Sequence, residues 1–390
     1  MSDSLCMGTL HARSSGAIWA LFFGVAACGS LNDPQRLFEP GLGTADPRPA
    51  AYLNFPADTD QAPRPDDDSQ PDFPRLLSQT GAFRNAAQLE PAPGLVRYDL
   101  QAPLWSDGAY KQRWMSLPAL GVIQVFDDAP WQVPEGTVFV KHFEMSLDES
   151  QPEVRRRLET RFLVAARGGS FYGVTYKWNA DETDAEIVLD AELEPLSIRG
   201  ADGVEREQPY LYPGPRDCNS CHGANSGYVL GLRTRQLNRD HEYRSDFPAV
   251  NQLVAWSGWG FLDHDFDNTD TMIAPRLADP TDESEPLEQR VRAYWDGNCA
   301  MCHAGKDGSV MGWDARISTP LEQQGLDRPP RGGNPSLPSL LIDPGSPEDS
   351  YIYVRGDTAE ASLRMPPIGR SRIDTAYVAV LEQWIESLVE

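Results

Sequence analysis

The pattern of apolar and polar positions between residues 76 and 205 predicts β-strands. Three runs have strand length and are rich in β-branched and aromatic residues: residues 136–145 (GTVFVKHFEM), 156–167 (RRLETRFLVAAR) and 171–178 (FYGVTYKW). Alternation along the first run places its residues on two faces, Val138, Val140 and His142 on one and Phe139, Lys141 and Phe143 on the other. Residues 167–170 (RGGS) predict a hairpin turn between the second and third runs. We therefore expect an antiparallel sheet or a small sandwich in this region.

From about residue 206 the pattern changes to short helical stretches separated by long loops. Two helices are expected within residues 226–239 and 249–261. A third helix is expected just before residue 299, because Leu287, Val291 and Tyr294 or Trp295 recur on one helical face. The last stretch of the chain predicts an amphipathic helix that Asp374 caps. Its apolar positions are Tyr377, Val380, Leu381, Trp384, Ile385 and Leu388.

The N-terminal residues have the features of an export signal. Arg13 precedes an apolar run from Ala17 to Ala27, which is too short for a stable membrane-spanning helix but suits a signal peptide. The run ends in Val-Ala-Ala-Cys, which resembles the bacterial lipoprotein box. We therefore expect residues 1–27 to be the signal peptide and Cys28 to be lipidated; ordinary cleavage at small residues is the alternative. Residues 28–75 are rich in proline, alanine and aspartate and predict a disordered linker that follows the lipid anchor.

Four of the six cysteines and two of the six histidines form one pattern, Cys-x-x-Cys-His, twice. The members are Cys218, Cys221 and His222 in the first motif and Cys299, Cys302 and His303 in the second. A zinc finger needs a second Cys or His pair nearby, and a thioredoxin-type pair does not need the histidine. A disulfide across two residues closes too small a loop to stabilise much. Covalent haem c explains every position, because the thiols bond the vinyl groups and the histidine ligates the iron. The sequence therefore predicts two covalently bound haem c groups.

The second motif lies in a context that resembles a class I cytochrome c domain. A helix leads into the motif, a loop carrying Met365, Pro366 and Pro367 follows, and a helix closes the chain. The resemblance implies that Met365 is the sixth iron ligand of the second haem, on the side opposite His303. The prolines stiffen the loop that holds the thioether; core packing is the alternative role of this methionine. His/Met coordination favours a raised reduction potential and leaves no open iron position.

No motif identifies the sixth ligand of the first haem, which His222 ligates from one side. The candidates are His241, His264 and Met272 downstream of the motif, and His142 from the β-rich region. His142 and Met272 rank first, His142 because a haem region this short needs a wall from its neighbour. An open iron position is the remaining alternative.

Several stretches, in this order, resemble a family of exported bacterial dihaem c-type cytochromes. They are residues 91–114, 136–143, 155–164, 173–186, 218–239, 298–303 and 364–369. The resemblance covers roughly residues 76–390 and implies a β-rich domain followed by cytochrome c modules. Some relatives in this family are fused to quinoprotein-dehydrogenase-like propellers, so a separate quinoprotein dehydrogenase is one candidate redox partner.

The predicted fold class is therefore a multidomain chain, β-rich at the N-terminus and mainly α-helical in its haem regions. The expected divisions are a β-rich domain over residues 76–205, a first haem module over 206–285 and a class I cytochrome c-like domain over 286–390. The net charge of −24 argues against nucleic acid as a partner and permits a basic redox protein.

We expect this exported lipoprotein to transfer electrons between redox partners, from the periplasmic or cell-surface side of a membrane. Gly29 after the lipidated cysteine fits sorting to the outer membrane. The alternative is a dihaem peroxidase-like enzyme, in which the second haem supplies electrons to an open or displaceable first haem. Both alternatives remain open at the level of the sequence.

Overall fold

The computed structural model describes residues 50–57, 63, 73–304 and 312–389. The predicted signal peptide and Cys28 lie outside these residues, as does most of the predicted linker. Among the described residues, no helix combines the length and the apolar character that crossing a membrane requires.

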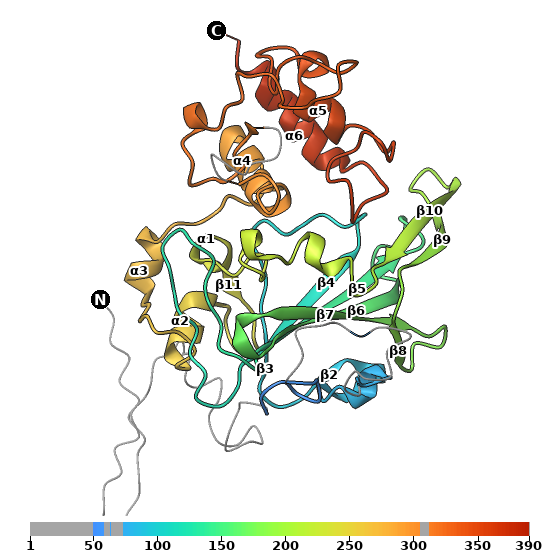
Figure 1. Ribbon diagram of the computed structural model, residues 1–390, viewed down its shortest axis with the longest axis vertical. Coiled ribbons are helices and arrows are strands. Elements are labelled where there is room, and N and C mark those ends of the chain that lie inside the picture. Colours follow the sequence, from blue (N-terminus) through green and yellow to red (C-terminus); the bar gives the residue numbers. More distant parts are fainter. Residues whose placement is uncertain (1–49, 58–62, 64–72, 305–311, 390) are drawn as a thin grey trace, which may run out of the picture. The chain divides into compact units, whose positions relative to one another are not determined.

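A six-stranded antiparallel sheet forms the centre of the β-rich region (Figure 1). Its strands, in spatial order, are β3 (Leu95–Arg97), β4 (Tyr110–Ser116), β5 (Val138–Ser146), β6 (Arg155–Ala165), β7 (Phe171–Trp178) and β8 (Ala185–Val188). The three predicted strands are β5, β6 and β7. The predicted hairpin turn between β6 and β7 is confirmed, because Ala166 N–H donates to the Ser170 carbonyl at 2.9 Å and both glycines between them have positive φ. The prediction of a β-rich chain with antiparallel pairing is therefore confirmed.

One face of the sheet is covered by the chain that precedes it. Val138 and Val140 of β5 are fully buried on this face, in a cluster that includes Phe55 and Phe73. The covering segment contains β1 (Phe83–Asn85) and β2 (Glu90–Pro91), which pair antiparallel. The prediction of a linker to residue 75 was therefore too long, since aromatic side chains in that polar stretch bury against the sheet.

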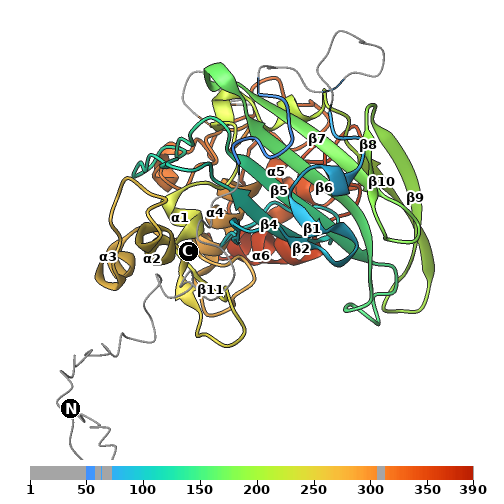
Figure 2. The same ribbon diagram turned by 90° about the horizontal axis from the view of Figure 1, so that it is seen from below.

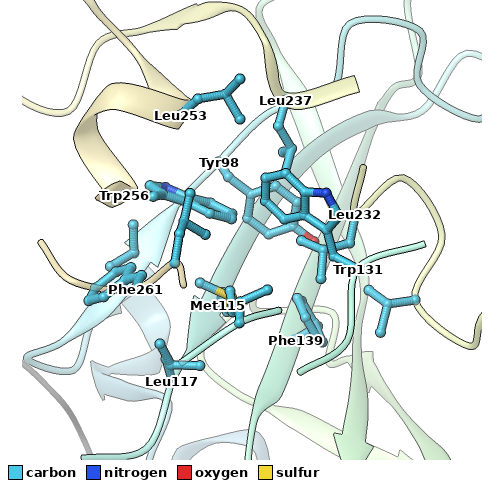
Figure 3. Packing of buried hydrophobic residues seen from close by; sticks show 14 of the residues in the cluster. Tyr98, Met115, Leu117, Trp131, Phe139, Leu232, Leu237, Leu253, Trp256 and Phe261 are labelled. Carbon is cyan, nitrogen blue, oxygen red and sulfur yellow. The ribbon is translucent and has the colours of Figure 1, made fainter. Parts of the chain in front are cut away.

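The opposite face of the sheet packs against short helices that follow the first Cys-x-x-Cys-His motif. These helices are α1 (Thr234–Leu237) and α2 (Gln252–Gly258); α3 (Asn268–Ile273) follows α2 in the chain and has no buried residue. Figure 3 shows the resulting core, in which Met115 and Phe139 of the sheet lie near Trp256 of α2 and near Trp131. The two predicted helices in this region are confirmed but are short. A two-stranded pair, β11 (Asp240–His241) and β12 (Val250–Asn251), lies between α1 and α2 in the chain.

A second hairpin extends the β structure beyond its predicted end at residue 205. It consists of β9 (Glu192–Arg199) and β10 (Glu205–Tyr212), and Figure 2 shows it beside the strands of the sheet. Leu196 and Tyr210 of the hairpin are buried together with Phe143 of β5. The predicted change to helices at residue 206 was therefore early, because β10 is completed only by pairing with β9.

The described residues of the C-terminal region contain three α-helices, which lie together in Figure 1. They are α4 (Leu287–Asn298), α5 (Tyr351–Gly356) and α6 (Thr375–Glu386). The predicted cap of α6 is confirmed, since Tyr377 N–H donates to the Asp374 carboxylate at 3.2 Å. The predicted apolar faces of α4 and α6 meet: Trp295 packs edge-on against Trp384 and donates its indole N–H to the Tyr377 hydroxyl at 2.8 Å.

The expectation of mainly α-helical haem regions is not met. Between the described residues 213 and 304, α1, α2 and α3 have only 4, 7 and 6 residues and α4 has 12, and long connections join α4 to α5 and α5 to α6. Prolines interrupt these connections at many positions and prevent longer helices. The remaining short elements are 3-10 helices at Leu77–Gln79, Ala86–Gln88, Arg167–Gly169, Cys218–Ser220, Ala224–Ser226, Leu321–Gln323 and Pro347–Asp349.

Candidate functional site

Both Cys-x-x-Cys-His motifs open into a single cavity of about 890 Å³. Its wall includes all six residues of the motifs and the predicted methionine ligand: Cys218, Cys221, His222, Cys299, Cys302, His303 and Met365. Protein interiors are normally packed with few voids larger than a water molecule, and ligand cavities measure roughly 300–1,000 Å³. A hollow of this size between two attachment motifs therefore indicates a large ligand.

The first motif presents a histidine that is ready to act as a ligand. The chain turns through a 3-10 helix at Cys218–Ser220, and His222 N–H donates to the Cys218 carbonyl at 2.9 Å. The Nδ1 atom of His222 lies 2.7 Å from the Tyr228 carbonyl, which can only accept a hydrogen bond. The proton therefore resides on Nδ1, and Nε2 keeps its lone pair on the cavity side. Burial lowers the pKa of His222 to about 4, so the imidazole is neutral, as a metal ligand must be.

Cys218 lies directly against the central sheet because β7 carries a glycine beneath it. A Cβ atom on Gly173 would stand 2.4 Å from the Cys218 sulfur and 2.9 Å from its Cβ. Burial raises the pKa of the Cys218 thiol, with the charge of Arg161 acting in the opposite direction. The first motif is thus held against the sheet at a point where only glycine fits.

The second motif begins where α4 ends. Cys299 follows the last helical residue, and its N–H donates to the Trp295 carbonyl at 2.8 Å. His303 is buried, and its ring centroid lies 4.9 Å from that of Trp313. The His303 carbonyl accepts a hydrogen bond from Ala315 N–H at 2.7 Å, which fixes the backbone after the motif.

Met365 reaches the same cavity from the loop between α5 and α6. Its backbone N–H donates to the Arg355 carbonyl at 2.9 Å. Farther along this loop, the buried Asp107 carboxylate accepts hydrogen bonds from the backbone N–H groups of Ser371 and Arg372 at 2.7 to 2.9 Å, and from the Ser371 hydroxyl at 2.9 Å. The structure therefore brings Met365 and His303 to one cavity, as the sequence predicted.

The two motifs, far apart in the sequence, are close in space. Burial raises the pKa of the Cys221 thiol, and the nearby Cys302 of the second motif raises it further. Both cysteines also line the same cavity. Groups attached at the two motifs would therefore be neighbours in one cavity.

A row of cations crosses the sheet on the cavity side. Arg113 of β4 pairs directly with Lys141 of β5, and Lys141 pairs with Arg161 of β6; all three line the cavity. Like charges directly opposite one another destabilise a sheet. Burial lowers the pKa of Lys141 well below its usual range, and the charge of Arg113 adds to this effect. Sequence reasoning missed this row, because only strand register aligns the three side chains.

Several buried donors on the cavity wall have no hydrogen-bond partner among the described residues. They are the Nε atoms of Arg161, Arg364 and Arg370 and the indole nitrogen of Trp105. Unpaired buried donors are rare in native structures and call for a missing acceptor. A large apolar ligand with carboxylates, such as haem with its propionates, fits a wall of this composition. The thiols and neutral imidazole described above fit covalent haem as well.

The leading candidates for the sixth ligand of the first haem do not reach the cavity. His142 lies on the opposite face of the sheet, where Nδ1 is 2.8 Å from the Thr160 hydroxyl and Nε2 is 3.2 Å from Glu144. Met272 on α3 is 85% exposed. The structure brings neither residue to the cavity, because strand alternation turns His142 away and α3 leaves Met272 in solvent. His241 and His264 do not line the cavity either.

Comparisons of the chain with models of protein families, with curated proteins and with solved structures find no match.

Proposed function

We propose that this chain is a dihaem c-type cytochrome that transfers electrons between exported redox partners. The observation that carries the proposal is the convergence of both Cys-x-x-Cys-His motifs and Met365 on one large cavity. Cys218 and Cys221 would hold the first haem, and Cys299 and Cys302 would hold the second. Bound haem supplies a one-electron iron couple.

The protein's own residues perform the tasks that such a carrier needs. His222 is held by the Tyr228 carbonyl and offers a neutral nitrogen to iron, and His303 is its counterpart in the second motif. Met365 is proposed as the sixth ligand of the second iron. The guanidinium groups of Arg113 and Arg161 and the unpaired donors on the wall would compensate the propionates. Close approach of the two motifs favours electron transfer from one haem to the other.

The sequence supports three further parts of the proposal: the type of the C-terminal haem domain, the lipid anchor and the redox partners. Residues 286–390 would form a haem domain of the class I cytochrome c type, despite its long loops. Lipidation at Cys28 would anchor the protein to a membrane, which we propose to be the outer membrane. The redox partners are proposed to be other exported proteins, with a quinoprotein dehydrogenase as one candidate donor.

The test is to count covalent haems on the full chain, produced in a bacterium that attaches haem c outside the cytoplasm. A pyridine haemochrome assay with a protein assay should give two haems per chain. Replacing Cys218 and Cys221 by serine should leave one haem, and so should the matched change at Cys299 and Cys302. Covalent haem that is absent from the wild-type chain would refute the proposal.

A dihaem peroxidase-like enzyme is the second candidate function. It is favoured by Arg161, which lines the cavity near Cys218 and pairs with the buried Glu159 carboxylate, itself hydrogen-bonded to Tyr210 at 2.7 Å. An arginine beside an open haem would stabilise charge as peroxide is cleaved. This candidate requires that the first iron bind peroxide, so peroxide turnover by the reduced protein distinguishes the two functions.

A further inference from the structure

Lys141 occupies the centre of the cavity-facing side of the sheet. It lies on β5, between Arg113 on β4 and Arg161 on β6, and it lines the cavity that His222 also lines. The first motif contacts the same face of the sheet, since the Cys218 sulfur lies over Gly173 of β7. The lysine therefore faces the cavity from the side of the sheet on which the first motif lies.

Lys141 is the member of the cation row that lacks an anionic partner. Arg113 donates to Asp99 at 2.9 Å, and Arg161 is paired with Glu159. The Nζ atom of Lys141 makes no hydrogen bond or ion pair with any described residue. It lies over the face of the Phe143 ring, 4.9 Å from the ring centroid. As an ammonium, Lys141 would be repelled by a guanidinium on each side; as a neutral amine, it would not.

Few other groups on the wall could bind iron through nitrogen or sulfur. Among the described residues outside the two motifs, the nitrogen- and sulfur-containing side chains on the wall are arginines, amides, tryptophans, Lys141 and Met365. Guanidinium groups stay protonated, and amide and indole N–H groups are donors without a suitable lone pair. Met365 belongs to the loop that follows α5 in the C-terminal region, with the second motif. Lys141 remains for the first motif.

We propose that Lys141 is the sixth ligand of the first haem iron, bound through Nζ on the side opposite His222. The inference rests on the proposed function. Ligation forms an Fe–N bond and releases the ammonium proton to solvent, and no oxidant or reductant is needed. The neutral bound amine also removes the like-charge contact with Arg113 and Arg161. A propionate counterion would instead keep Lys141 charged, and this difference makes the proposal testable.

The test compares the oxidised full-length wild type with Lys141→Arg, both loaded with haem. Arginine keeps the positive charge and the length but does not ligate iron. We expect electron paramagnetic resonance to show two low-spin haems in the wild type. In Lys141→Arg, we expect one of the two haems to become high-spin. After reduction, the variant should bind one equivalent of carbon monoxide more than the wild type.

A second variant distinguishes the loss of an iron ligand from misfolding. Lys141→Ala should show the same high-spin haem, and added imidazole should return it to the low-spin state. Near-infrared magnetic circular dichroism of the wild type should report an amine–imidazole pair at one haem. Unchanged spectra in Lys141→Arg, with two haems still attached, would overturn the lysine ligand and leave the dihaem function standing. A haem count of zero in the wild type would instead overturn the proposed function.

Discussion

Gly297, near the end of α4, lies so close to the backbone of Ala102 that a side chain at this position would collide with it. A Cβ atom built on it would stand 2.3 Å from the Ala102 carbonyl oxygen and 3.3 Å from the Ala102 carbonyl carbon. Ala102 is itself fully buried, and its N–H and carbonyl are both bonded to the Gln236 side chain at 2.9 Å. The obstacle is therefore backbone that is tied in place, which cannot rotate away as a side chain can.

The Gly297→Ala change should destabilise the protein by about 2–4 kcal/mol. Cβ atoms do not approach other atoms to less than 3.0 Å, so α4 and Ala102 must separate by at least 0.7 Å from the present 2.3 Å. Overpacking of this kind costs ~1–3 kcal/mol. Weakening the two bonds from Gln236 adds about 1 kcal/mol each. The higher helix propensity of alanine offsets at most about 1 kcal/mol of this destabilisation.

Thermal unfolding of the haem-loaded protein, followed by far-ultraviolet circular dichroism, measures this effect. A loss of about 3 kcal/mol corresponds to a decrease in Tm of roughly 6–12 °C in a domain of 150–250 residues, and to a smaller decrease in a larger one. Gly356→Ala is the matched control, because Gly356 is also helical and the nearest atom to its added Cβ is Tyr377 Cε1 at 3.5 Å. If Gly297→Ala unfolds at the same Tm as Gly356→Ala and the wild type, the contact between α4 and Ala102 is not as the structure describes.

Two further substitutions test contacts that hold the wall of the cavity in place. Gly173→Ala should displace the Cys218 sulfur, which lies 2.4 Å from the added Cβ, and should lower the haem count toward one per chain; an unchanged count of two would contradict this. Asp107→Ala removes the acceptor of the hydrogen bonds from Ser371 and Arg372. Because bonds to a charged group contribute ~1.5–3 kcal/mol, we expect a lower Tm in thermal unfolding, and an unchanged Tm would show that water replaces the carboxylate.

Local patterns in the sequence predicted several elements correctly. The alternation in β5, the glycine turn between β6 and β7, and the Asp374 cap of α6 are all decided by residues a few positions apart. The two attachment motifs are local in the same sense, because their chemistry requires three residues within five. Short-range rules of strand period, turn conformation and helix capping are sufficient for such features.

Tertiary structure decided the rest of the site. Alternation separates Lys141 from His142, but only packing decides which face of the sheet the first motif meets. That choice brings Lys141 to the cavity and leaves His142 bonded to Thr160 and Glu144. Phe55 likewise lies in a polar stretch that predicts a linker, yet it is buried against a sheet whose strands come later in the chain.

The sequence by itself therefore determined which residues form the two Cys-x-x-Cys-His motifs, and it determined the strands β5, β6 and β7, the turn between β6 and β7 and the cap of α6. It did not determine that the two motifs share one cavity, or that Arg113, Lys141 and Arg161 stand in a row on its wall. The physical reason is the range of the interactions. Strand register and the docking of loops depend on burial and pairing between segments far apart in the chain, and no local pattern encodes those contacts.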